Sequence, residues 1–158
     1  MKEWKKNIKY IVLVIFLIAI LPVSLWLVAT NIDTASKDNA EKYFKKDKDD
    51  IILVTDYLVN SNSSSISIND TDIITIKDEK VKEAFNRLFK KKYSAIDKNN
   101  NAIEFTIWTR FNNFGSGIVY SINNEEEPTI EYLTKLVPLS EDGWYYYEAD
   151  YNLWRDQQ

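Results

Sequence analysis

The sequence predicts an α+β fold: an N-terminal transmembrane helix followed by a small antiparallel sheet with helices packed on one face. Three observations predict it. Residues 11–29 form a stretch of 19 residues without a charge. Residues 37–91 contain two segments with helical spacing of apolar residues, and residues 93–148 contain alternating segments joined by short turns. Because short spacers suit antiparallel pairing, the domain is expected to be α+β.

The uncharged stretch at 11–29 is long enough to cross a membrane, since about 20 apolar residues span a bilayer. Four lysines and one glutamate precede it, whereas the residues after it carry 16 basic and 23 acidic side chains. The positive-inside rule then places the N-terminus in the cytoplasm and the C-terminal domain outside. A cleaved signal peptide is the alternative, but its apolar region is usually about 7 to 15 residues and ends in a small-x-small site.

These observations divide the chain into four parts. We expect a cytoplasmic basic segment at 1–10, a transmembrane helix at 11–29, a juxtamembrane linker at 30–36 and an extracytoplasmic α+β domain at 37–158. The protein is therefore predicted to reside in the cell membrane as a single-pass protein. The outer part carries a net charge of −7, which argues against nucleic acid as a partner.

Two long helices are expected in the outer domain. The first runs from 37 to about 59, with Ser36 as its cap and a possible break near Asp47. Its apolar residues repeat at spacings of 7, 3 and 4 from Phe44 onward. The second runs from 79 to 91 and has a complete core-facing stripe. The members of that stripe are Val81, Ala84, Phe85, Leu88 and Phe89.

Alternation and turn composition predict the strands. We expect them at 66–68, 73–77, 93–96, 102–111, 118–122 and 144–148. Turns or loops are expected at the polar segments 97–101, 112–117 and 141–143. Pro128 is expected to open a short helix that buries Ile130, Leu133 and Leu136 and ends before Pro138.

The chain contains neither cysteine nor histidine. A disulfide framework, a lipobox cysteine, a Cys/His zinc site and a Ser-His-Asp triad are therefore all excluded. Residues 97–101 are similar to the start of a calcium loop, but that loop needs glycine at Ala102 and glutamate at Trp108. No catalytic, metal-binding or cofactor-binding residue is predicted.

Aromatic residues are the best candidates for an interaction surface. Trp108 stands alone among polar neighbours on its strand. In the last strand Tyr145 and Tyr147 point to one face, while Trp144 and Tyr146 point to the other. The sequence therefore leaves two alternatives: Trp108, Tyr145 and Tyr147 form an exposed stacking platform, or these aromatics belong to the core or are partly covered.

The C-terminal third also carries a resemblance. The stretches GIVYS at 117–121, EYLTKL at 131–136 and PLSEDGWYYY at 138–147 are similar to the C-termini of small single-pass membrane or secreted proteins of low-GC Gram-positive bacteria. This resemblance implies an envelope location and transfers no functional residue.

The function expected from these observations is a membrane-anchored binding or interaction module of the cell envelope, without enzymatic activity. Its partner would be an envelope protein or a wall polymer. Two alternatives remain open: a small surface enzyme that uses carboxylates, such as Glu148 and Asp150, and tyrosines, or an accessory subunit of a membrane complex. An enzyme should show a concave pocket with facing carboxylates.

Overall fold

The computed structural model describes residues 34–69, 72–110, 113–123 and 126–153. These residues belong to a compact unit that starts at Thr34. The predicted transmembrane helix and the basic segment before it lie outside the described residues. Within the described part of the chain, no helix combines the length and apolar character needed to cross a membrane.

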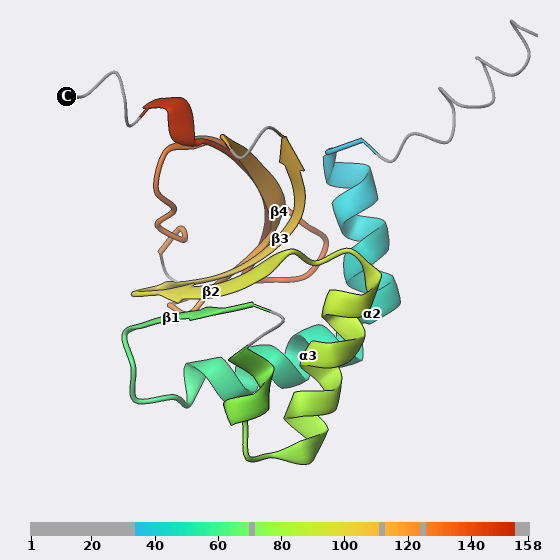
Figure 1. Ribbon diagram of the computed structural model, residues 1–158. Coiled ribbons are helices and arrows are strands. Elements are labelled where there is room, and N and C mark those ends of the chain that lie inside the picture. Colours follow the sequence, from blue (N-terminus) through green and yellow to red (C-terminus); the bar gives the residue numbers. More distant parts are fainter. Residues whose placement is uncertain (1–33, 70–71, 111–112, 124–125, 154–158) are drawn as a thin grey trace, which may run out of the picture. The chain divides into compact units, whose positions relative to one another are not determined.

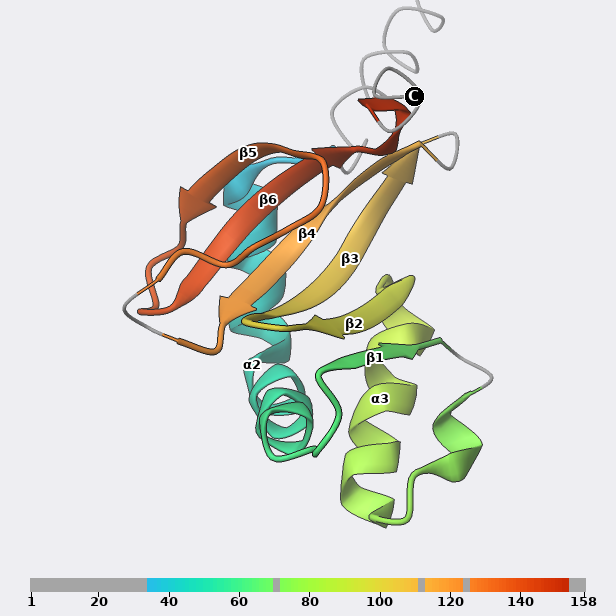
Figure 2. The ribbon, with the colours of Figure 1, turned by 90° about the vertical axis from the view of Figure 1, so that its left-hand side faces the viewer.

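The predicted α+β class is confirmed by two helices and a six-stranded antiparallel sheet of order β1-β2-β3-β4-β6-β5. The sheet is strongly curved, and α2 and α3 lie on its convex side (Figure 1, Figure 2). The strands are β1 (Ser65–Ile68), β2 (Ala95–Asn99), β3 (Ala102–Arg110), β4 (Phe114–Ser121), β5 (Leu133–Pro138) and β6 (Trp144–Asp150).

Both helices form where the sequence predicts them. Helix α2 (Lys37–Val59) is continuous through Asp47, and the Ser36 hydroxyl accepts a hydrogen bond from the Asn39 N–H at its start. Helix α3 (Glu79–Lys91) is capped by Asp78, whose carboxylate accepts hydrogen bonds from two backbone N–H groups of the first turn. The N-terminal caps satisfy donors that have no partner within a helix, so both starts are fixed by local chemistry.

The main core lies between the helices and the convex side of the sheet. Buried residues in the first half of α2 contact the sheet, and the ring centroids of Phe44 and Trp144 are 4.7 Å apart. The second half of α2 packs on α3, and Leu58 and Phe85 are fully buried in this part of the core. Burying such side chains stabilises the fold by about 1.5–3 kcal/mol each. One apolar stripe on α2 therefore joins the sheet to α3.

Lys98 of β2 is buried and caps the C-terminus of α2. Its ammonium donates to the Leu58 carbonyl at 2.7 Å and to the Ser61 carbonyl and hydroxyl at 3.1 Å each. Three acceptors match the three donors of an ammonium, and a cation suits the negative end of a helix. Residues 97–99 pair with both β1 and β3, so the predicted hairpin tip shortens to Asn100 and Asn101.

Three predicted elements are wrong. Residues 72–75 form a 3₁₀ helix, η1 (Asp72–Thr75), in place of a strand, because Ile73 and Ile76 are both buried at a spacing of three. Residues 128–132 form no helix, and Leu133–Pro138 is a strand at the edge of the sheet, paired with β6. Gly115 and Gly117 belong to β4 and not to a loop.

A bulge in the β3–β4 pair turns Trp108 to the helix side of the sheet. The register shifts between Thr106 and Trp108, which adds one residue and so reverses the face to which the later residues of β3 point. At the bulge Gly117 lies so close to β3 that an added Cβ would sit 2.0 Å from the Phe105 carbonyl oxygen. Position 117 therefore requires glycine, because the backbones of β3 and β4 approach too closely to leave room for a side chain.

Gly117→Ala should destabilise the domain severely, by about 3 kcal/mol or more, since the obstacle is backbone that cannot rotate away. Gly115→Ala is the matched control, because its added Cβ would meet only the Tyr151 ring, at 3.1 Å. Chemical denaturation followed by tryptophan fluorescence measures both. Equal stability of the two variants would contradict the role given to Gly117.

Lys98→Met should lower the free energy of unfolding by about 2 kcal/mol. The substitution removes the hydrogen bonds of the ammonium and leaves the Leu58 and Ser61 carbonyls without that donor. Lys90→Met, at an exposed position of α3, should change stability by less than about 0.5 kcal/mol. The same denaturation measurement applies. A Lys98→Met protein as stable as Lys90→Met would show that water satisfies the end of α2 equally well.

Candidate functional site

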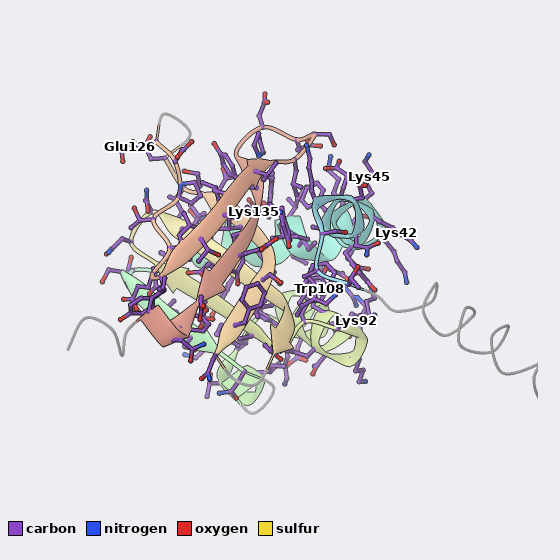
Figure 3. The ribbon with its side chains drawn as sticks, turned by 90° about the horizontal axis from the view of Figure 1, so that it is seen from above. Lys42, Lys45, Lys92, Trp108, Glu126 and Lys135 are labelled. Carbon is purple, nitrogen blue, oxygen red and sulfur yellow. The ribbon has the colours of Figure 1, made fainter. Side chains whose placement is uncertain are left out.

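The three aromatic residues singled out from the sequence do not form one surface. Trp108 is half-buried on the helix side, with its ring 5.7 Å from that of Tyr43 and 6.5 Å from that of Tyr146 (Figure 3). Tyr147 lies on the opposite, concave face, is fully buried and hydrogen-bonds Thr106 at 2.8 Å. Tyr145 is half-buried on that same face. Tyr147 therefore contributes nothing to an exposed platform.

The acidic pair Glu148 and Asp150 also does not form a carboxylate site. Glu148 accepts from the Tyr146 hydroxyl at 2.7 Å and from the Lys135 ammonium at 3.0 Å. Burial alone would raise the pKa of Glu148, but these two donors lower it below its ordinary value. Asp150 accepts from Asn152 instead. Glu148 is thus an ionised, paired carboxylate on the helix side of the sheet.

The concave face of the sheet carries a small apolar cluster of its own. Tyr147 and Val119 are fully buried in it, and Ile130 covers them from the segment between β4 and β5. That segment crosses the face (Figure 2). The Asn101 side chain holds it, because it donates to the Glu127 carbonyl at 3.1 Å and accepts from the Thr129 N–H at 3.0 Å.

An acidic cavity of about 100 Å³ opens on this face. Asp97 of β2 and Glu104 of β3 are register partners, so their side chains leave the sheet side by side on the same face. Glu131 comes from the covering segment. The cavity is lined by Asp97, Asn99, Glu104, Glu131 and Tyr151. Among these residues there is no lysine or arginine to balance the three carboxylates.

Glu104 is the most perturbed group of the cavity. Its side chain is 6% exposed, and its partner is the Asn99 amide at 3.5 Å. Burial raises the pKa of Glu104 to about 7; the Asn99 hydrogen bond opposes this shift, and the charges of Asp97 and Glu131 add to it. Burial also raises the pKa of Asp97, against a hydrogen bond from Ser67. The cavity therefore exchanges a proton near neutral pH.

This arrangement permits two kinds of chemistry. Desolvated carboxylates without a cation attract an ammonium or guanidinium group, and Glu104 could also give or accept a proton. Burial raises the pKa of Tyr151, so its hydroxyl remains a neutral donor. Among the described residues no group of three or more acidic side chains has an arrangement that could hold a metal ion.

Sequence reasoning missed this cavity because it placed Asp97 in a turn and Glu104 among solvent-facing positions. The available signal was the two-residue turn at Asn100 and Asn101, where Asn100 has φ 42°. Asparagine tolerates that left-handed backbone. A turn placed there fixes the hairpin register and sets Asp97 opposite Glu104.

Comparisons with protein-family models, curated proteins and solved structures gave no match. The site is therefore interpreted from its own geometry and electrostatics.

The raised pKa of Glu104 predicts that stability falls as pH rises. The folded state holds the proton more tightly than the unfolded state, so the free energy of unfolding should fall between about pH 4.5 and about pH 7 and stay low above it. The loss attributable to Glu104 is on the order of 3 kcal/mol. Chemical denaturation at pH 5 and at pH 8 measures this loss, and Glu104→Gln should abolish most of the difference in stability between the two pH values.

Glu126→Gln is the control for this prediction, because Glu126 is exposed. Its pH dependence should match that of the parent protein. If Glu104→Gln and Glu126→Gln lose stability equally between pH 5 and pH 8, Glu104 does not titrate in the way described.

Proposed function

We propose that the chain is a single-pass envelope protein whose outer domain binds a cationic group of a peptide or wall polymer in the cavity on the concave face. One observation carries this proposal: three carboxylates converge on a cavity whose lining residues include no cation. Burying a carboxylate without a partner costs free energy. A bound cation would compensate the carboxylate charge and remove that cost, so charge compensation contributes to the binding free energy.

The size of the cavity limits what can enter. About 100 Å³ is far below the roughly 300–1,000 Å³ of sites that enclose whole ligands. It suits the ammonium or guanidinium end of a side chain whose remainder stays outside. Tyr151, which is 39% exposed, lies at the cavity and offers an aromatic face to such a cation.

The membrane assignment rests on the sequence. The uncharged segment 11–29 and the lysines before it support an uncleaved anchor with the domain outside the cell. The resemblance of residues 117–147 to small envelope proteins supports the same location. In this arrangement α2 follows the linker directly, and the cavity is presented to envelope components.

A second candidate, proton-transfer catalysis by Glu104, is favoured by its pKa of about 7. Such a value suits a general acid or base at neutral pH. The facing carboxylate of Asp97 is the feature expected of a small carboxylate enzyme. Binding is the preferred function because the three carboxylates have no cation among the lining residues and the cavity is too small to enclose a whole substrate.

The binding proposal is tested with the full chain in nanodiscs of neutral lipid. An acetylated, amidated tripeptide with a central lysine is titrated by calorimetry, alongside its norleucine counterpart. We expect the lysine peptide to bind and the norleucine peptide not to bind. Glu104→Gln and Asp97→Asn should each weaken binding of the lysine peptide at least about tenfold, or by about 1.4 kcal/mol. Glu126→Gln should bind like the parent protein.

Two outcomes would count against the proposal. Binding of the norleucine peptide with equal affinity would show that charge is not recognised. Unchanged affinity in Glu104→Gln would place the cation elsewhere. Conversion of a peptide or wall fragment that stops in Glu104→Gln would favour the catalytic candidate.

A further inference from the structure

A groove lies on the helix layer, between the C-terminal half of α2 and the start of α3. Its volume is about 360 Å³. None of the residues that line it belongs to the acidic cavity. The groove is lined by Leu53, Asp56, Tyr57, Asn60, Ser61, Asp78 and Val81.

The wall of the groove is largely apolar. Val81 is buried, Leu53 is half-buried, and Tyr57 is 37% exposed with its ring edge-on to Phe85 at 6.3 Å. Ile52 is also exposed on the same helix. Apolar side chains gathered at a groove between two helices are typical of surfaces that receive a side chain from another segment.

Both charged residues that line the groove, Asp56 and Asp78, are acidic. Asp56 is exposed and has no ion-pair partner among the described residues. Asp78 caps α3 and is exposed as well. The C-terminus of α2 adds no uncompensated charge here, because the Lys98 ammonium already caps it, so the two aspartates carry the negative charge of the groove. A ligand with positive charge beside an apolar side chain complements this pattern.

We propose that this groove binds a segment of a partner protein that carries an apolar side chain flanked by lysine or arginine. The apolar side chain contacts Leu53, Tyr57 and Val81, and the cations lie against Asp56 and Asp78. A second copy of the chain fits less well, because a symmetric contact would bring the acidic residues of one groove against those of the other.

The test uses the full chain in nanodiscs of neutral lipid and a pentapeptide probe, acetylated and amidated, of sequence Lys-Lys-Leu-Lys-Lys. The central leucine is replaced by photo-leucine so that the site of attachment is read by mass spectrometry. We expect crosslinks within residues 52–61 or 78–81. Asp56→Lys should weaken binding at least tenfold.

Asp49→Lys is the matched control. Asp49 is exposed on the same helix, two turns before Asp56, and the substitution changes the net charge equally. Its binding should stay within twofold of the parent protein. Tyr57→Ser should weaken binding of the same probe without changing its salt dependence, which separates the apolar contact from the charge.

The proposal is overturned by any of three results. The first is an equal loss of affinity in Asp56→Lys and Asp49→Lys. The second is equally tight binding of a Glu-Glu-Leu-Glu-Glu probe, and the third is a crosslink that joins two copies of the chain. Glu104→Gln should not affect this probe at the groove, so failure here is distinct from failure of the acidic cavity.

Discussion

The fold depends on one helix, α2, whose two halves pack against different parts of the domain. Its first half supports the curved sheet through Phe44, and its second half contacts α3 through Tyr57, whose ring meets that of Phe85. Charges at the midpoint fix the angle between the helices. Asp47 is buried and accepts a hydrogen bond from Lys91 at 2.5 Å, and Asp50 accepts three hydrogen bonds from Nε and Nη2 of Arg87. Since a buried carboxylate needs its partners, these contacts exclude helix arrangements that separate them.

The curvature that α2 supports creates two different sheet faces. The bulge after Thr106 adds local twist, and Gly117 admits the close approach of β3 that this requires. The convex face is filled by the main core. On the concave face, a covering segment held by the Asn101 side chain closes part of the surface. What remains open is the acidic cavity, so the candidate site follows from the bend in the sheet.

The elements that sequence predicts well are those whose information is local. Helix α3 has a cap and a complete apolar stripe within 14 residues, and α2 has a cap and a regular repeat, so both could be located. The failures depend on distant contacts. The strand after Pro128 forms because β6 lies beside it, and the face of Trp108 depends on one extra residue in a strand pair. The pairing of Asp97 with Glu104 required a register that only the turn at Asn100 specifies.

The acidic cavity and the support of α2 have a common origin in the pleat of β2. Successive side chains of a strand point to opposite faces, so Lys98 reaches the C-terminus of α2 while Asp97 and Asn99 line the cavity. The cation that could neutralise Glu104 is therefore committed to the other side of the sheet. A shift of one residue would give the cavity its lysine and would remove the cap from α2. The same register that stabilises the helix layer thus leaves three carboxylates unbalanced on the concave face, and an external cation can compensate them without loss of the fold.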